Sequence, residues 1–212
     1  MNIKNRKSVL ILAPHTDDGE FGCGGTMARL LEEGNDVYYV AFSTCRASVP
    51  EGEREDILEI ELKKAMGSFE IDDEHVFILD YPVRKFSAYR QEILDDMLKI
   101  SSKVNPSIVF APSIHDIHQD HHVVAEEAMR AFKKTTLFAY EIPWNNFTFS
   151  NQTYFKLEKR HIQKKRNAID CYRTQVNRPY ASEDFTFGQA RVHGVQIGCE
   201  YAEVFEAVRV IL

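Results

Sequence analysis

Short apolar runs alternate along the chain with longer segments in which apolar residues recur every three or four positions. The apolar runs cover residues 9–13, 37–42, 76–79, 108–111 and 137–140. The segments with helical periodicity cover residues 26–33, 57–66, 90–100 and 123–132. Strands that alternate with helices are typical of a parallel sheet, and near-continuous apolar strands indicate burial on both faces. The pattern therefore predicts a Rossmann-like α/β fold, with a mostly parallel sheet and helices on both faces.

Turn-forming residues separate these elements. Gly34 and Asn35 follow the first helical segment, and these residue types are common just beyond a helix end. Asn105 precedes Pro106 after the third helical segment, and a residue before proline avoids the helical conformation. We therefore expect the first and third helices to end at these positions.

The last third of the chain follows a different pattern. It contains an aromatic loop over 143–151, a long helix expected over 156–175, and a terminal strand expected over 202–212. No repeat or low-complexity segment separates this part from the rest. We therefore expect one domain over residues 1–212, with the core sheet in 1–141 and an extension of the same domain in 142–212.

Composition narrows the class of protein. Hydrophobic residues make up 44% and charged residues 27% of the 212 residues, as in ordinary globular domains. The net charge of −6 gives no basis for nucleic-acid binding, and no apolar run approaches the roughly 20 residues that span a membrane. The apolar stretch near the N-terminus lacks a small-residue cleavage site, so we interpret it as a strand rather than a signal peptide. Four widely spaced cysteines without a CxxC pair fit a reducing cytoplasm.

Chemistry-bearing side chains concentrate in two loops. The first reads PHTDDGEFGCGG over residues 14–25 and the second reads PSIHDIHQDHH over 112–122. Each loop follows an apolar run, and the second holds four of the eight histidines. In an open parallel sheet, functional loops follow the carboxyl ends of strands, and the first and fourth strands often flank the point where strand order reverses. We therefore expect the two loops to meet.

Together, the loops contain the donors of a zinc site. His15, Asp18 and His121 supply two imidazole nitrogens and one carboxylate oxygen, which suits a catalytic zinc ion with one open position. Such an ion lowers the pKa of its bound water to about 7. Asp17 is then the candidate general base for that water. His118, three residues before His121, is the candidate to polarise a carbonyl or to protonate a leaving amine.

Other roles for nearby residues follow from the same chemistry. Asp120 is expected to orient a ligand histidine. Asp17 and Asp18 have a simpler interpretation as caps of a helix that starts near Gly22, with the glycines allowing a close turn against the sheet. Trp144, in the aromatic loop, fits the core and the wall of a sugar pocket equally well.

The two loops resemble the signature motifs of the LmbE-like family, which includes the PIG-L de-N-acetylases. The family motifs are usually written AHPDDE with a following GxGG, and HxDH; this chain has PHTDDGEFGCGGT and HQDHHVV. KRNAIDCYRTQ over 165–175 and YAEVF over 201–205 resemble later segments of the family, so the resemblance covers nearly the whole chain. It implies a Rossmann-like fold and zinc-dependent removal of acetyl groups from small molecules, mostly N-acetylated sugars of the glucosamine type.

The resemblance also implies site residues and assembly. Carried over position by position, it makes His15, Asp18 and His121 the ligands of one zinc ion per chain. It makes Asp17 the base and His118 the electrophilic or acid histidine. Members of the family are often oligomeric, so a homo-oligomer is compatible with it.

The chain departs from the family pattern at several positions. Thr16 replaces a proline, which removes a fixed φ, and Gly19 stands where glutamate is common. Arg46 or Arg54 is the candidate for an arginine that many members carry after the second strand. His193 stands where relatives often carry arginine. These last positions are expected to face the substrate, so the identity of the substrate is not predicted.

Two other functions compete with deacetylation. The residues from Asp116 to His121 echo the HxHxDH motif of metallo-β-lactamase-like hydrolases, although the first position is aspartate and that fold does not need the first loop. The third hypothesis is a non-catalytic module that binds a metal or ligand within a larger assembly. Replacement of Asp17 distinguishes an enzyme from such a module, because only an enzyme loses turnover.

Overall fold

The computed structural model describes residues 6–211. They form one seven-stranded sheet with helices packed against it. The strands are β1 (Ser8–Ala13), β2 (Asp36–Ala41), β3 (Val76–Ile78), β4 (Ile108–Pro112), β5 (Thr136–Tyr140), β6 (Thr153–Leu157) and β7 (Tyr201–Arg209). The α-helices are α1 (Asp18–Glu32), α2 (Ile57–Ser68), α3 (Arg90–Val104), α4 (Gln119–Ala131), α5 (Lys159–Ile169) and α6 (Glu183–Gln196). Residues 1–5 of the expected domain and Leu212 of the expected terminal strand lie outside the described residues.

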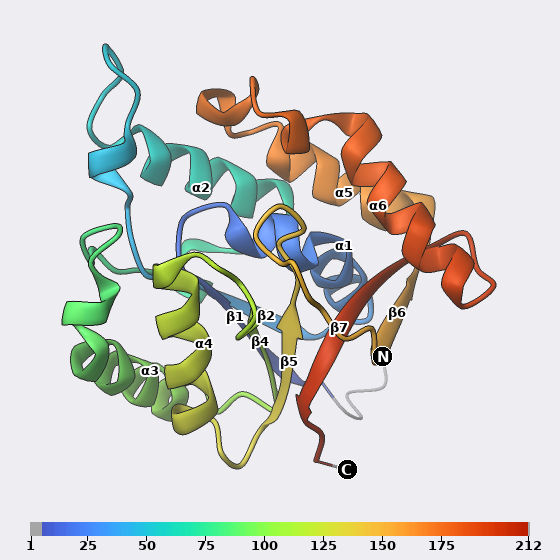
Figure 1. The fold of residues 1–212 in the computed structure, drawn as a ribbon, viewed down its shortest axis with the longest axis horizontal. Helices are drawn as coiled ribbons and strands as arrows, with labels where there is room; N and C mark the ends of the chain where they lie inside the picture. Colours follow the sequence, from blue (N-terminus) through green and yellow to red (C-terminus); the bar gives the residue numbers. More distant parts are fainter. Residues whose placement is uncertain (1–5, 212) are drawn as a thin grey trace.

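The strand order β3-β2-β1-β4-β5-β7-β6 confirms the predicted Rossmann-like fold. The first five strands in this order run parallel, and β7 is antiparallel to both of its neighbours, β5 and β6. The strand order reverses between β1 and β4, at the centre of the sheet (Figure 1). The loops after these two strands meet there, as the sequence predicts.

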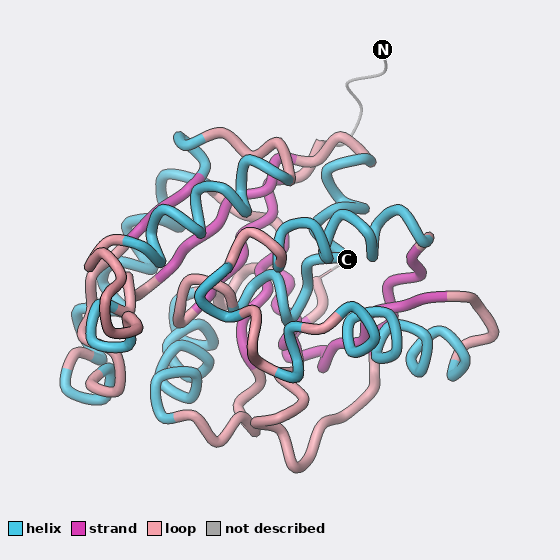
Figure 2. The backbone as a smooth tube through the Cα atoms, turned by 90° about the horizontal axis from the view of Figure 1, so that it is seen from above, coloured by secondary structure: helices cyan, strands magenta, loops and turns pink. Residues whose placement is uncertain are grey.

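Both faces of the sheet are buried. In β1, Val9 and Ile11 point to the face covered by α1, α2 and α5, whereas Leu10 and Leu12 point to the face covered by α3 and α4. Figure 2 shows the strands between helices, and α6 packs against β7. This double burial is the reason that the central strands read as continuous apolar runs. None of the helices within residues 6–211 is both long and apolar enough to cross a membrane.

The first helix begins at Asp18, earlier than the expected start at residue 26. The glycines that suggest a turn are helical, and they allow α1 to lie close to the sheet. A Cβ atom at Gly22 would lie 2.2 Å from the ring of Tyr140, and one at Gly19 would lie 2.5 Å from the ring of Tyr39. At the other end of α1, Gly34 has a φ of +84°, which confirms that the helix ends there.

The expected long helix over 156–175 is wrong, because the segment is divided between β6 and the shorter α5. Glu158 separates the two elements by forming a reciprocal capping box with His161. Helix α6 is absent from the sequence-based prediction. Its buried positions include Thr186, Ala190 and His193, which are small or polar and therefore give no clear apolar period.

Candidate metal centre

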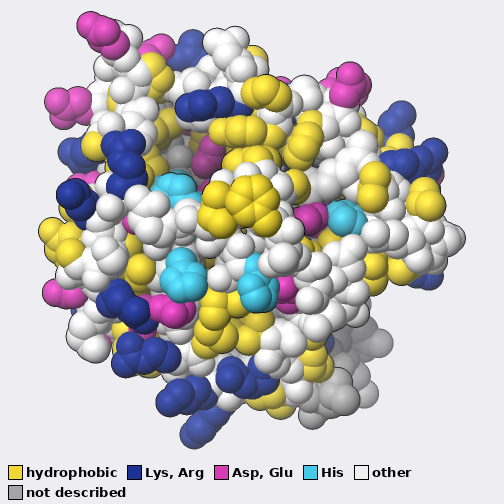
Figure 3. Space-filling model, in the orientation of Figure 1, with side chains coloured by type: hydrophobic (Ala, Val, Ile, Leu, Met, Phe, Trp, Pro, Cys, Tyr) yellow, Lys and Arg dark blue, Asp and Glu magenta, His cyan; other side chains and the backbone are white. Residues whose placement is uncertain are grey.

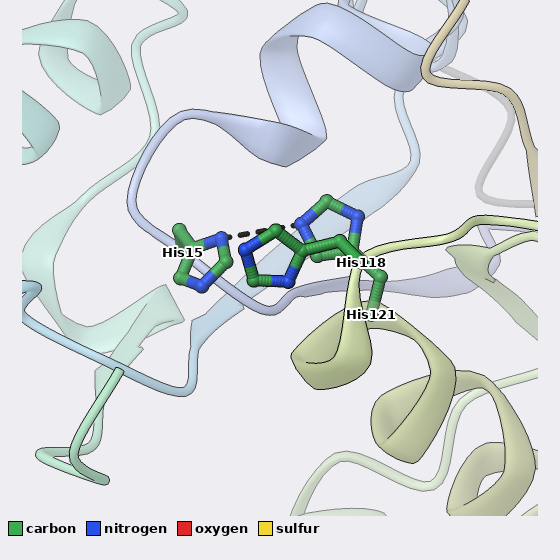
Figure 4. A group of neighbouring side chains, drawn as sticks. All are labelled: His15, His118 and His121. Carbon is green, nitrogen blue, oxygen red and sulfur yellow. Dashed lines mark hydrogen bonds between the residues drawn. The ribbon is translucent and has the colours of Figure 1, made fainter. Parts of the chain in front are cut away.

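Three side-chain atoms from the two loops form a triangle with nearly equal edges. Asp18 Oδ2 lies 3.1 Å from His15 Nδ1 and 3.2 Å from His121 Nε2, and the two nitrogens are 3.2 Å apart. Figure 4 shows His15 on the loop after β1 and His121 in the first turn of α4, joined by this contact. Ligands held at 2.0–2.2 Å around a tetrahedral zinc ion are separated by about 3.3 Å. The triangle therefore has the size that one such ion requires.

Local backbone contacts hold these donors in place. The backbone N–H of His15 donates to Asp18 Oδ2 at 2.8 Å, which fixes the carboxylate across the turn. His118 is the N-cap residue of α4, and its Nδ1 accepts the backbone N–H of Asp120 at 3.2 Å. The first turn of α4 then carries His121 toward His15.

Each of the two imidazoles in the triangle also contacts a second carboxylate through its other nitrogen. His15 Nε2 lies 3.1 Å from Asp120 Oδ2, and His121 Nδ1 lies 2.7 Å from Asp116 Oδ2. Metal-bound histidines are typically oriented in this way. The contact of Asp120 is the one expected from the sequence, whereas the contact of Asp116 was not predicted. Asp116 is recognisable only once the fold places it beside His121.

The charges at the triangle favour a cation. Burial lowers the pKa of His121, but the carboxylates of Asp18 and Asp116 outweigh it and raise that pKa to about 10. Burial raises the pKa of Asp18, but the charges of His121 and His15 hold it well below its ordinary value. Positive charge beside it thus favours the ionised form of this buried carboxylate. A divalent ion bound by these three residues would supply that charge, so the donor set fits a metal.

Asp17 lies beside the triangle. Burial and the charge of Asp18 raise the pKa of Asp17 to about 7. Asp17 occupies the N-cap position of α1, but its side chain makes no capping hydrogen bond. The side chain of Asp18 accepts the backbone N–H of His15 rather than a backbone N–H of α1. Helix capping therefore does not explain the aspartate pair.

His118 stands next to both His15 and His121. Its ring centroid lies 4.8 Å from that of His15 and 4.7 Å from that of His121. The three histidines offer nitrogens within 4.8 Å of one another, but Asp18 is closer to His15 and His121 and completes the tighter triangle. Burial and the charges of His121 and His15 lower the pKa of His118 to about 4, so the ring is neutral at pH 7.

The position of Thr16 is fixed by two tyrosines. Its carbonyl oxygen accepts the hydroxyl of Tyr172 at 2.6 Å and that of Tyr39 at 3.0 Å. Both hydroxyls also contact the carboxyl group of Glu20, and burial raises the pKa of Glu20 to about 8. Helix α1, strand β2 and the segment after α5 thus hold the loop after β1 in place without the family proline.

The residues that line the cleft at this site differ in part from those expected. The cleft has a volume of about 240 Å³ and includes Trp144, whose ring stacks on Tyr180 at 3.7 Å. Arg46 contacts Asp80, Arg54 contacts Asp56, and His193 contacts Glu141, and none of these three expected substrate residues lines the cleft within residues 6–211. The arginines that line the cleft are instead Arg84 and Arg178.

The fold and the site define a Rossmann-like α/β protein with a His-Asp-His donor set between β1 and β4. Residues 10–132 match the family described as "PIG-L: GlcNAc-PI de-N-acetylase". The match covers more than half of the chain, so the protein belongs to the PIG-L family. This membership confirms the resemblance to LmbE-like proteins and contradicts the metallo-β-lactamase-like alternative.

Curated relatives cover the chain to different extents. "Diacetylchitobiose deacetylase" of Thermococcus kodakarensis is 28% identical over 54% of this chain and 45% of its own length. "Probable N-acetyl-alpha-D-glucosaminyl L-malate deacetylase 2" of Bacillus anthracis is 25% identical over 82% of this chain and 83% of its own length. The chain thus spans about half the length of the first relative and most of the second.

Solved structures share the whole architecture. The "conserved protein TT1542" of Thermus thermophilus is 26% identical, with a TM-score of 0.78 over 97% of this chain and 96% of its own. "GalB, the 4-carboxy-2-hydroxymuconate hydratase" of Pseudomonas putida has a TM-score of 0.78 at 19% identity, over 97% of this chain and 98% of its own. The second likeness shows the fold alone, and a fold by itself does not fix a reaction.

Proposed function

We propose that this protein is a zinc-dependent amidohydrolase that removes the acetyl group from an N-acetylated amino sugar of the glucosamine type. The observation that carries the proposal is the triangle of His15 Nδ1, Asp18 Oδ2 and His121 Nε2, with edges of 3.1 to 3.2 Å, at an open cleft. Membership of the PIG-L family and the deacetylase names of two curated relatives support the same reaction.

His15, Asp18 and His121 would hold the ion. Two imidazoles, one carboxylate and an open fourth position are typical of catalytic zinc. Bound there, zinc supplies Lewis acidity, which lowers the pKa of a water molecule and polarises a carbonyl oxygen. Asp116 and Asp120 keep the two imidazoles in orientation through the contacts at 2.7 and 3.1 Å.

Asp17 and His118 would handle the proton and the developing charge. With its pKa raised to about 7, Asp17 is suited to take a proton from the attacking water and pass it to the leaving nitrogen. The C–N bond of the amide then breaks, and acetate and a free amine leave. Because His118 Nδ1 accepts a backbone N–H, the neutral ring carries its proton on Nε2 and donates it as a hydrogen bond to the acetyl oxygen.

The cellular setting is part of the proposal. All four cysteines are unpaired in the structure, which supports a reducing compartment such as the cytoplasm. Trp144 and Tyr180 present a stacked aromatic surface beside the site, which supports a role as the wall of a sugar pocket.

The proposal is tested by measuring acetate released from N-acetylated sugars, including nucleotide-linked ones, together with bound zinc by elemental analysis. We expect about one zinc ion per chain. Asp17→Asn should lower kcat by about 10²- to 10⁴-fold while zinc stays bound, because the variant loses the base but no ligand. Asp184→Asn, an exposed position on α6, is the matched control and should leave kcat unchanged.

Two outcomes would contradict the proposal. Undiminished turnover in Asp17→Asn would exclude its role as base. Tightly bound zinc without acetate release from any N-acetylated sugar would favour the non-catalytic module instead.

A further inference from the structure

Two arginines line the cleft without an acidic partner. Arg84 lies on the loop between β3 and α3, and Arg178 lies between α5 and α6. Within residues 6–211 neither guanidinium group forms an ion pair. Most arginines of this chain do form ion pairs, namely Arg6, Arg29, Arg46, Arg54, Arg90, Arg130, Arg160, Arg166 and Arg191. The cleft therefore holds two exposed cationic groups that the protein itself does not neutralise.

Arg84 is tied to the metal centre through its backbone. Its N–H donates to the carboxylate of Asp120, which in turn contacts His15. The φ of Arg84 is +66°, a left-handed conformation that residues with a side chain rarely adopt. Such conformations cluster at functional sites. The side chain of Arg84 thus starts from a fixed point beside the donor triangle.

Arg178 lines the same cleft from a different segment, between α5 and α6. Its backbone N–H donates to the carbonyl oxygen of Gln175 at 2.9 Å, and its own carbonyl accepts the N–H of Ala181 at 2.9 Å. Tyr180, two residues further on, stacks on Trp144. Arg178 therefore extends from a short, braced turn next to the aromatic surface.

The balance of charge in the cleft leaves these arginines unmatched. Asp17 and Asp18 are the acidic lining residues, and one divalent ion would balance both. The two guanidinium charges of the lining then remain without a partner, in a chain whose net charge is −6. Figure 3 shows Lys and Arg side chains on two sides of a hollow in which His and acidic side chains are visible.

We infer that the substrate carries an anionic group, a carboxylate or a phosphate, beside its N-acetylated sugar, and that Arg84 and Arg178 recognise this group. The planar guanidinium group matches both anions through paired hydrogen bonds. The inference rests on the proposed function for the sugar, but the recognition of the anion can be tested separately from turnover.

The experiment uses three amine products that differ in charge: glucosamine 1-phosphate, muramic acid and methyl glucosaminide. Calorimetry on the zinc-loaded protein should give a Kd for the phosphate or the carboxylate that is about tenfold lower than for the neutral sugar. The relative Kd of the two acids identifies which anion the cleft prefers. Added salt should reduce the preference, because screening weakens exposed charge pairs.

Variants assign the preference to residues. Arg84→Gln and Arg178→Gln should each reduce the ratio of Kd values between neutral and anionic sugars several-fold, and the double variant should abolish the difference. Arg84→Lys should retain part of the difference, because the charge remains without the planar fork. Arg173→Gln is the matched control, since Arg173 is exposed, forms no ion pair within residues 6–211 and does not line the cleft.

The outcomes separate this inference from the proposed function. Equal Kd values for the three sugars, or a preference that survives the double variant, would overturn the anion site even if acetate is released. Absence of acetate release from every substrate would refute the deacetylase, whereas an anion preference lost in the arginine variants would still support the site.

Discussion

Nδ1 of His121 lies 2.7 Å from Oδ2 of Asp116, and the other oxygen of the same carboxylate accepts the backbone N–H of His118 at 2.8 Å. Asn145 also donates to Oδ2 from the loop after β5, at 3.4 Å. One buried carboxylate therefore connects a proposed metal ligand, a proposed catalytic histidine and the wall of the cleft.

Asp116→Ala should weaken zinc binding by about 10- to 100-fold, because His121 loses the partner that orients its ring and raises its basicity. The measurement is competition with a chromophoric chelator at constant pH. Asp184→Ala on α6 is the control and should leave the zinc affinity unchanged. An unchanged affinity in a folded Asp116→Ala protein would show that the ring is held by other contacts.

The buried ion pair of Lys165 and Glu203 is predicted to stabilise a kink in α1. The kink falls at Cys23, whose φ is −146°. Glu203 accepts the backbone N–H groups of Gly25 and Thr26, and Lys165 donates to the carbonyl of Phe21 and to Glu203 at 2.8 Å. Lys165→Met should therefore lower the free energy of unfolding by about 3–5 kcal/mol, because it leaves a buried carboxylate unpaired.

Urea unfolding of this variant can be compared with that of Glu33→Gln. Glu33 pairs with Arg29 on the exposed surface of the same helix, where such a pair contributes about 0.3–0.5 kcal/mol. Similar losses in the two variants would mean that the buried pair does not support the kink.

Two glycine substitutions should change stability in opposite directions. Gly22→Ala should destabilise the protein by about 1–3 kcal/mol, because the added Cβ would lie 2.2 Å from the ring of Tyr140. That ring is held by its hydroxyl, which donates to Leu12 at 2.8 Å. Gly188→Ala on α6 meets no atom within 4 Å and should stabilise the helix by up to about 1 kcal/mol. Thermal denaturation distinguishes these signs, and a neutral Gly22→Ala would show that Tyr140 can move.

The contact of His193 with Glu141, at 2.5 Å, should make stability depend on pH. Burial lowers the pKa of His193, but the contact with Glu141 outweighs burial, so the pKa lies above 6.5. Burial raises the pKa of Glu141, but the contact with His193 outweighs burial, so that pKa lies below 4.5. The contribution of His193 is present below 6.5 and is lost as pH rises through its folded pKa. The contribution of Glu141 is present above 4.5 and is lost as pH falls through its folded pKa. The pair therefore stabilises most between about pH 4.5 and 6.5.

Glu141→Gln should consequently cost more stability at pH 6 than at pH 9, with a loss of about 1.5–3 kcal/mol at the lower pH. Urea midpoints at the two pH values provide the measurement. Glu183→Gln, at an exposed position, should cause the same small loss of stability at both pH values. If the cost of Glu141→Gln is independent of pH, His193 is not charged in the folded protein.

The candidate site could be predicted from the sequence because its donor residues follow directly after two strands. His15 and Asp18 come at the end of β1, and His121 opens the helix after β4. Parallel strands bring their carboxyl ends to one edge, so two loops nearly a hundred residues apart could be paired by topology alone. The two arginines proposed to contact the substrate could not be found this way. Arg84 and Arg178 lie on irregular loops, whose paths depend on local turns rather than on hydrophobic period.

The sequence by itself determined the central parallel strands, the helices between them and the set of proposed metal donors. These follow from local periodicity and from residue chemistry. Only the tertiary structure decided the division of 156–175 into β6 and α5, the helical state of the glycines after Asp18, and the partnership of Asp116 with His121. Each of these depends on contacts between distant segments, such as β7 inserted between β5 and β6. Such contacts can override local secondary-structure propensity, and they do not appear in the hydrophobic periodicity of the sequence.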